Sequence, residues 1–317
     1  MKHLLPGSQV NSYTFIVTED KHQQRLDQYL HELIPAYSRS YFQKIIQDRN
    51  VSINNLVVLK AGHRVKAGDH VACTISRIDF SRSAAAIDPT LLHGLDVGLI
   101  SPEPDFLIIN KPAGLVVHKP AHASRQVTLV DWLVASYPHL QSIGDAERPG
   151  IVHRLDMQTS GLIIIPRTVN AHAAFTQMFK DRQIKKTYLA LVEGHPPREA
   201  QIDYRIMRHP TERTKMAHSK SQGRDAITDF EVIEYLKKDA ALVKAFPKTG
   251  RTHQIRVHCL AWGHPIIGDA VYGSRSKIIA RHALHSAELN FEYKGKLYHF
   301  TAPMPEDMAH ALEVLRS

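Results

Sequence analysis

The chain has 317 residues, 43% of them hydrophobic, which is enough to fill a core in each of the two domains that this length suggests. Its 40 Lys and Arg against 31 Asp and Glu give a net charge of +9 and a pI near 9.4. This charge favours a polyanionic partner, although many basic proteins bind no nucleic acid. No apolar run approaches the ~18 residues of a membrane span, and the first residues lack the apolar core of a secretory signal. We therefore expect a cytoplasmic protein that does not bind a membrane.

Cysteine and histidine usage argues against a disulfide framework and against a metal centre. The two cysteines, Cys73 and Cys259, are far apart and stand in unrelated contexts. Histidine is abundant, with 21 residues, but the spacings suit no metal site. His118 and His122, for example, are separated by a proline that prevents one helix from presenting both. We expect no metal; a histidine-based metal hydrolase remains a rival hypothesis that rests on histidine abundance alone.

Two helices followed by short strands are predicted for the first part of the chain. The apolar residues of Gln24–Ile34 fit one face of a helix, and a second helix is expected after Ser38. Strands then continue to about Thr74, with a turn at Asn54-Asn55. The basic residues on or beside the polar face of the second helix are Arg39, Lys44 and Arg49. Charge alone leaves open whether this is an ordinary solvated face.

The same stretch resembles an S4 RNA-binding domain. The matching segments are RLDQYL, YSRSYFQKIIQDRNVSINN and GHRVKAGDHV, and together they cover about Gln24 to Thr74. The resemblance implies a small αα-β module whose second helix presents positive charge to RNA phosphates. After it, Ser76–Gly98 loses all periodicity and indicates a linker. We place the domain boundary near Ser83, which divides the chain into residues 1–83 and 84–317.

The second domain is predicted to be α+β, with strands outnumbering helices. Leu162–Ile165 is a run of four apolar residues and indicates a buried strand. Ala171–Lys180 has helical periodicity, and the alternating stretch KTYLALVEG indicates a strand that ends at Gly194.

An acidic side chain stands beside the turn that leads into the buried strand. In RPGIVHRLDMQTSGLIII, Arg148 to Ile165, Asp156 follows Arg154 by two residues. A carboxylate in this place is positioned rather than free. Two structural interpretations stay open, because Asp156 could cap the turn or pair with Arg154.

A second informative segment is KTGRTHQIRVHCLAWGHPIIGD, Lys248 to Asp269. It predicts a helix that Thr252 could cap and that Gly263 could end. His253 and Arg256 lie near the start of this helix, and an arginine at the rim of a core needs a carboxylate partner. The alternative is an ordinary solvated or RNA-facing arginine.

Together these segments resemble the catalytic domain of the RluA family of pseudouridine synthases. Four stretches match in the family's order: INKPAGLVVHKP (Ile109–Pro120), GIVHRLDMQTSGLIII, KKTYLALVEG (Lys185–Gly194) and KTGRTHQIRVH (Lys248–His258), the last followed by GHPIIGDAVYG. The similarity extends from about Asp105 to Pro305. It implies the pseudouridine synthase fold, with a mixed, mainly antiparallel central sheet.

The resemblance also implies roles by position. Asp156 would be the catalytic aspartate, Arg256 the arginine that forms a salt bridge with it, and Tyr188 the tyrosine that packs against the target ring. Arg154 would fill the gap that the flipped base leaves. One departure is Met157-Gln158, where the family has Lys-Asp, and we expect it to alter local RNA contacts rather than activity. The residues expected to contact RNA are Arg39, Lys44, Arg49, Arg154, Arg251 and His253.

The chemistry explains these residue types. Uracil detaches from C1′ of the ribose, rotates and reattaches through C5, so no atom is gained or lost and no cofactor is expected. Asp156 could attack C1′, add to C6 or abstract a proton from C2′, and the sequence leaves all three open. Each needs an ionised carboxylate, which a nearby Arg256 would favour. The base must be extruded at a cost of a few kcal/mol, and specific RNA recognition favours loops in which bases are exposed.

An S4-like domain on an RluA-like domain implies large-subunit ribosomal RNA as substrate. The stretches IPAYSRS (Ile34–Ser40), RHPTERTKMA (Arg208–Ala217) and APMPEDM (Ala302–Met308) resemble family members that modify several uridines in one hairpin loop of 23S rRNA at the subunit interface. We expect a monomer that acts on 23S rRNA or on a pre-50S particle. The alternatives are a synthase that acts at other 23S sites and a non-catalytic RNA-binding or ribosome-assembly protein.

Overall fold

The computed structural model describes residues 10–34, 37, 39–76, 92, 94–118, 126–145, 148–212 and 214–317, with the backbone alone at residues 10, 40, 44 and 76. These residues form two compact units. The first takes the described residues of Met1–Leu92, Val130–Ile151 and Arg167–Val169; the second takes those of His93–Leu129, Val152–Pro166 and Asn170–Ser317. The predicted boundary near Ser83 lies outside the described residues and stays a prediction.

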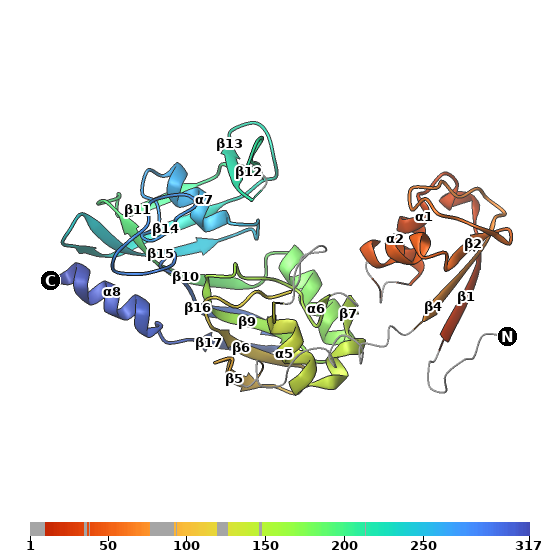
Figure 1. Cartoon of the computed structure of the whole chain (residues 1–317), viewed down its shortest axis with the longest axis horizontal. Coiled ribbons are helices and arrows are strands. Elements are labelled where there is room, and N and C mark those ends of the chain that lie inside the picture. The colour runs from red at the N-terminus through yellow and green to blue at the C-terminus, as the bar shows by residue number, and fades with distance from the viewer. Residues whose placement is uncertain are drawn as a thin grey trace. The chain divides into compact units, whose positions relative to one another are not determined.

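The first unit contains a small antiparallel sheet that two helices cover (Figure 1). Its strand order is β1 (Val10–Ile16), β4 (His70–Ser76), β2 (Val51–Ile53) and β3 (Leu56–Val57). The helices are α1 (Leu26–Leu33) and α2 (Arg39–Gln47), after a short 3-10 turn η1 (Glu19–Lys21). Leu30 of α1, Phe42 of α2 and Val71 of β4 are fully buried in one shared core. The predicted order of two helices before the strands is therefore present, with β1 in front of it as an addition.

Further short elements of the first unit come later in the chain. They are α5 (Leu129–Ser136), the 3-10 turn η2 (Pro138–Ser142) and the strand pair β7 (Gly144–Asp145) and β8 (Arg148–Pro149). The Arg167 guanidinium lies 5.9 Å from the ring centre of Tyr137, which ties the short segment at Arg167 to the end of α5.

The second unit is built on a nine-stranded sheet, counted over the described residues. Its order is β11-β14-β15-β10-β16-β9-β6-β5, and β17 pairs with β16. The strands are β5 (Gly98–Pro102), β6 (Phe106–Lys111), β9 (Ser160–Pro166), β10 (Lys185–Glu193), β11 (Glu199–Ile202), β14 (Thr228–Leu236), β15 (Ala240–Pro247), β16 (Leu284–Tyr293) and β17 (Lys296–Thr301). The pair β9 and β16 is parallel, whereas β6 with β9 and β10 with both its neighbours are antiparallel. The predicted mixed, mainly antiparallel sheet is confirmed.

Strand β9 shows why the run Leu162–Ile165 is apolar throughout. All seven residues of β9 are buried, because strands flank it and helix α6 (Val169–Lys180) packs on it. At the parallel crossing, Gly161 has a φ of +110°, and a side chain there would overlap the carbonyl oxygen of Ser286. Glycine is therefore required for β9 and β16 to approach so closely.

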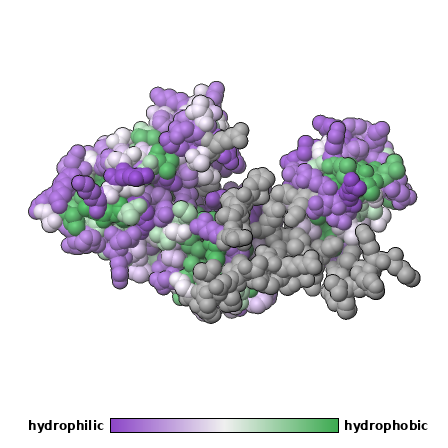
Figure 2. Space-filling model, in the orientation of Figure 1, coloured by the Kyte–Doolittle hydropathy of each residue, from purple (hydrophilic) through white to green (hydrophobic). Residues whose placement is uncertain are grey.

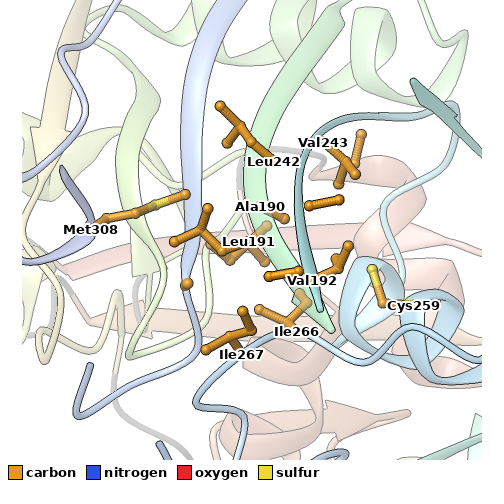
Figure 3. Packing of buried hydrophobic residues seen from close by; sticks show 14 of the residues in the cluster. Ala190, Leu191, Val192, Leu242, Val243, Cys259, Ile266, Ile267 and Met308 are labelled. Carbon is orange, nitrogen blue, oxygen red and sulfur yellow. The ribbon is translucent and has the colours of Figure 1, made fainter. Parts of the chain in front are cut away.

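The largest core lies around β10 (Figure 3). Val192 of β10 and Cys259 of α7 (Gln254–Ala261) belong to it, as does Met308 of α8 (Glu306–Arg316). Figure 3 shows Met308 and Cys259 at opposite ends of this cluster, with Ala190, Leu191 and Val192 of β10 between them. Figure 2 shows that hydrophilic residues dominate the visible surface of this unit. Among the described helices, none is both long and apolar enough to cross a membrane.

A separate hairpin stands next to α7 (Figure 1). It consists of β12 (Arg205–Arg208) and β13 (Met216–Ser219), which pair with each other in antiparallel fashion. Ile206 and Met216 pack with Val257 of α7 in a small apolar cluster. His258 of α7 also hydrogen-bonds the carbonyl oxygen of Tyr204 at 3.0 Å, so the base of the hairpin is held on the helix.

Candidate active site

Asp156 lies in the loop that leads into β9. The backbone closes this turn itself, because the Thr159 amide donates to the Asp156 carbonyl oxygen at 3.0 Å. The carboxylate is therefore available for other partners, and its side chain is 17% exposed. Arg154 is exposed, and the described partner of the Asp156 carboxylate is Arg256 rather than Arg154. Of the interpretations left open by the sequence, the structure thus favours a carboxylate held from another element.

Arg256 on the first turn of α7 joins two carboxylates. Its Nη1 donates to Asp156 Oδ2 at 3.2 Å, and its Nε and Nη2 donate to both oxygens of Asp269 at 2.7 and 2.9 Å. Burial alone would lower the pKa of Arg256, but the hydrogen bonds and charge of Asp269 outweigh it and raise the pKa. The guanidinium is only 6% exposed and stays charged, so it presents a fixed positive charge to the Asp156 carboxylate.

His253 and Tyr272 lie beside this pair. His253 Nε2 is 4.0 Å from Asp156 Oδ1, and its Nδ1 is 2.7 Å from the Tyr272 hydroxyl. The Tyr272 ring centre is 4.9 Å from the Arg256 guanidinium carbon, which is the geometry of a cation–π contact. Burial lowers the pKa of His253, so its neutral form is favoured.

The predicted cap of α7 at Thr252 is wrong. The N-cap is His253, in a left-handed conformation with a φ of 57°, and it makes no side-chain cap. The reason is Gln254, whose Oε1 accepts from the Arg251 amide at 3.0 Å and from the Thr249 hydroxyl at 2.7 Å. The side chain of the first helical residue thus holds the loop before α7, in which His253 rather than Thr252 takes the N-cap position. Gly263 follows the helix with a φ of 86°, as expected for a residue that ends it.

Tyr188 lies on β10, directly opposite Ser286 of β16. It is 8% exposed. Burial raises its pKa to about 12, against a hydrogen bond with Ser286 that lowers it, and the negative charge of Asp156 raises it further. The phenol is therefore neutral at any pH at which the protein is expected to work.

The loop at Asp156 is also tied to β6. The Lys111 ammonium, fully buried at the end of β6, donates to the carbonyl oxygens of Pro112, Leu115 and Met157 at 2.8, 2.9 and 3.1 Å. Burial lowers its pKa to about 7, and the Asp156 charge opposes that shift. Three carbonyl acceptors use all three ammonium protons, which also favours the charged form. The sequence signal was a lysine at the end of a mostly apolar strand.

The other side of the loop is held by the residues that precede β16. His282 Nε2 lies 2.8 Å from the Thr159 hydroxyl, and Arg281 Nη1 donates to the Gln158 carbonyl oxygen at 3.0 Å. Arg281 also pairs with Asp307 at the start of α8, at 2.7 Å. Like Lys111, these residues were not singled out from the sequence, because their partners are distant in the chain.

The remaining predicted RNA-binding residues are spread over both units. Arg251 is half-buried, and its Nε donates to the carbonyl oxygen of Asp225 at 3.0 Å. Arg39 and Arg49 belong to the first unit, and the Lys44 side chain lies outside the described residues. Their contacts with RNA stay a prediction. Over the described residues, no three His, Cys, Asp or Glu side chains gather into a group that could hold a metal ion.

Comparison with known proteins gives consistent family matches. Residues 105–261 match the family described as RNA pseudouridylate synthase, and residues 24–71 match the S4 domain. The chain is 35% identical over 320 residues to ribosomal large subunit pseudouridine synthase D of Escherichia coli (strain K12), covering 96% of this chain and 94% of the relative. It is also 35% identical over 311 residues to the uncharacterized RNA pseudouridine synthase YlyB of Bacillus subtilis (strain 168), covering 97% and 99%.

A solved structure, human RNA pseudouridylate synthase domain containing 1, aligns with a TM-score of 0.55 and 29% identity over 66% of this chain and 83% of its own. A second, human RNA pseudouridylate synthase domain containing 4, aligns at 0.56 with 24% identity over 74% and 96%, a likeness of fold. The predicted family and the S4 domain are confirmed. The chain belongs to the RNA pseudouridylate synthases and is an RluA-family pseudouridine synthase that carries an S4 domain.

Proposed function

We propose that this enzyme isomerises specific uridines of 23S rRNA to pseudouridine, in one hairpin loop at the subunit interface, with Asp156 as its catalytic carboxylate. The substrate is taken from the relatives named ribosomal large subunit pseudouridine synthase D, which match nearly the whole chain. The observation that carries the role of Asp156 is its contact with Arg256 at 3.2 Å in a half-buried setting. The buried guanidinium donates to one oxygen of this carboxylate and leaves the other oxygen open to substrate.

The two oxygens of Asp156 have different surroundings. Oδ2 accepts from Arg256, whereas Oδ1 lies 4.0 Å from His253 Nε2, which is beyond hydrogen-bond distance. We assign Oδ1 as the oxygen that acts on the target nucleotide. Attack at C1′, addition at C6 and proton abstraction at C2′ all begin from this ionised oxygen, and the proposal does not depend on which occurs.

Tyr188 and Arg154 complete the proposed uridine site. Tyr188 offers a rigid ring beside the carboxylate, against which an extruded uracil would pack. Because the burial of Tyr188 keeps its phenol neutral, we assign it a packing role rather than that of a general base. Arg154 is exposed two residues before Asp156, where a long basic side chain would replace the extruded base in its stack.

In the first unit, we propose that the arginines held by Asp27 bind RNA phosphates. Arg39 donates to Asp27 at 2.9 Å yet keeps 41% of its side chain exposed, so part of its guanidinium faces solvent. Arg49, exposed after α2, would add a further contact, as would Lys44. Such contacts supply affinity that is independent of RNA sequence and falls with salt. We further propose a cytoplasmic monomer with its domain boundary near Ser83, acting on 23S rRNA or a pre-50S particle.

The experiment that tests this proposal is pseudouridine mapping of 23S rRNA after incubation with wild-type protein, Asp156→Ala and the control Asp96→Ala. Asp96 is an exposed carboxylate in the same unit. Modification of one interface hairpin by wild type and control, and none by Asp156→Ala, is the expected result. Modification elsewhere in 23S rRNA would show that the enzyme acts at another site of this RNA. Absence of modification in rRNA and in ribosomal subunits would favour a non-catalytic RNA-binding protein.

A further inference from the structure

Tyr272 lies where the hairpin β12–β13, helix α7 and the Asp156 site meet. It follows Asp269 in the chain, is 6% exposed, and packs in the apolar cluster formed with Ile206 of β12 and Val257 of α7. Its ring and its hydroxyl have different partners. The ring contacts Arg256 and the hydroxyl contacts His253, and these two residues flank the Asp156 carboxylate.

The hydroxyl of Tyr272 contacts Nδ1 of His253 and so bears on the tautomer of that imidazole. It accepts a hydrogen bond from the Met216 amide of β13 at 2.7 Å, and it lies 2.7 Å from His253 Nδ1. A phenol has a single proton. The Met216 amide is a donor only, and among the described residues His253 Nδ1 is the partner of this hydroxyl that can accept, so we assign the phenol proton to Nδ1, which is then unprotonated. The neutral imidazole therefore carries its proton on Nε2, the nitrogen that faces Asp156 Oδ1 at 4.0 Å.

The ring of Tyr272 holds the other neighbour of Asp156. The Arg256 guanidinium lies over it at 4.9 Å from the ring centre, while Asp269 fixes the edge of that guanidinium. Arg256 thus has one face and one edge occupied, and its remaining Nη1 donor points to Asp156 Oδ2. One tyrosine therefore contacts both groups that flank the carboxylate.

We propose that Tyr272 is a positioning residue of the pseudouridine-forming reaction: it acts through His253 and Arg256, sets the donors on both sides of Asp156, and connects them to the hairpin β12–β13. This inference rests on the proposed catalytic role of Asp156. The Nε2–H of His253 is directed to Oδ1, and a closure of about 1 Å would bring it into hydrogen-bond distance. When the substrate occupies the site, that donor orients the reacting oxygen.

The test compares Tyr272→Phe with Tyr235→Phe. Both changes remove one hydroxyl. Tyr235 lies on β14, and among the described residues its hydroxyl donates to the Pro196 carbonyl oxygen, at 2.9 Å. Tyr272→Phe keeps the ring under Arg256. We expect its kcat to fall about 10-fold or more, as misplacement of reacting groups does, with the RNA Kd within about 2-fold of wild type. Tyr235→Phe should match wild type in both. Equal kcat in all three proteins, or a loss confined to Kd, would overturn the proposal.

Two further measurements separate positioning from a general loss of structure. In ¹⁵N-histidine spectra, the His253 signal is the one that is missing from the spectrum of His253→Asn. This signal should show the Nε2–H tautomer in wild type and should no longer show it in Tyr272→Phe. Asparagine is chosen because it tolerates the left-handed backbone of His253. If Tyr272 acts through His253, the double variant should lose no more kcat than the larger single loss. Additive losses or an unchanged His253 signal would contradict the inference.

The failure of this inference can be told from the failure of the proposed function. An active Asp156→Ala protein, or an inactive wild type, would overturn both, because Tyr272 would then have no catalytic carboxylate to position. An active wild type with an inactive Asp156→Ala and a fully active Tyr272→Phe would overturn this inference alone.

Discussion

Arg256 donates a single hydrogen bond to Asp156, at 3.2 Å, and two to Asp269, at 2.7 and 2.9 Å. The guanidinium can serve both carboxylates because its donors point along different edges of one plane. Asp269 is fully buried and serves as the anchor, whereas Asp156 is partly exposed. The stronger, bidentate pair therefore orients the arginine, and the weaker bond is the one that faces substrate.

We predict that Arg256→Lys keeps the charge but loses the catalytic geometry. A lysine ammonium is a point charge and cannot bridge two carboxylates in a fixed plane. We expect kcat to fall about 100-fold, the scale of a misplaced reacting group, with a lower melting temperature because Asp269 loses a buried partner. Single-turnover kinetics and thermal unfolding measure the two effects.

The control for this change is Arg316→Lys. Arg316 also forms a two-point pair, with Glu234 at 3.0 and 2.7 Å, but on the exposed side of α8. An exposed pair of this kind contributes little to stability, so the control should keep wild-type kcat and melting temperature. Wild-type kcat in Arg256→Lys would show that the bridge between Asp156 and Asp269 is dispensable.

We predict acid-sensitive stability in the first unit, caused by Asp27. Its buried carboxylate accepts from Arg25 at 3.0 and 3.1 Å, from Gln43 at 2.7 Å and from Arg39 at 2.9 Å. Burial alone would raise its pKa, but these bonds outweigh it and lower the pKa from 3.8 to about 2. Because the folded value is the depressed one, the stabilisation is fully present above pH 3.8 and is lost as pH falls to about 2. Over this window it amounts to about 2 kcal/mol.

Hydrogen exchange of α1 and α2 between pH 2 and pH 5 measures this contribution. Asp27→Asn should be less stable than wild type at pH 5, and the difference should shrink towards pH 2. Glu32→Gln is the control on the same helix, since Glu32 is exposed and bonded by Lys21 and Gln24. A difference between wild type and Asp27→Asn that does not vary with pH would contradict the assignment.

The elements that sequence reasoning found are those with a strong local pattern. The apolar run at Leu162–Ile165 lies within β9, the alternating stretch before Gly194 is β10, and the periodic stretch Ala171–Lys180 lies within α6. Strand β1 was missed, because its pairing with β4 joins residues some sixty positions apart and leaves no local signature. The start of α7 was misplaced because the loop held by Gln254 makes His253, and not Thr252, the residue before the helix.

The proposed site divides in the same way. Asp156, Tyr188 and Arg256 were named because each stands in a recognisable segment, and the structure brings Asp156 and Arg256 into contact across 100 residues. Lys111 and Tyr272 also stand in recognisable segments, INKPAGLVVHKP and GHPIIGDAVYG, but nothing in those segments assigned them a role. Lys111 reaches Met157 across 46 residues and Tyr272 reaches Met216 across 56, so their partners become visible only in three dimensions.

We predict that the phenol of Tyr188 does not titrate in the working range. Burial raises its pKa to about 12, so it remains protonated up to about pH 10.5. The pH profile of kcat should therefore have the same shape in wild type and in Tyr188→Phe between pH 8 and pH 10.5. Tyr188→Ala, which also removes the ring, should lose more activity than Tyr188→Phe. An inflection near pH 10 that only wild type shows would identify the phenolate as a base.

We predict that Gly161→Ala separates β9 from β16 and so disturbs the loop that carries Asp156. Two costs combine at this position, because φ is +110° and a new Cβ would overlap the Ser286 carbonyl oxygen, a backbone atom that cannot rotate away. Gly295→Ala is the matched control, since Gly295 also has a positive φ, of 75°, but open space around its Cα. The control should cost about 1 kcal/mol.

Gly161→Ala should cost about 3 kcal/mol or more in urea unfolding, the range of changes that strain a packed core. Ser286 lies opposite both Gly161 and Tyr188. A shift of β16 therefore also moves the Tyr188 ring, against which we propose that the target uracil packs. At a temperature where the variant is still folded, kcat should therefore fall together with stability. Equal unfolding free energies for Gly161→Ala and Gly295→Ala would show that the backbone conformation alone sets the cost and that β9 and β16 tolerate a wider spacing.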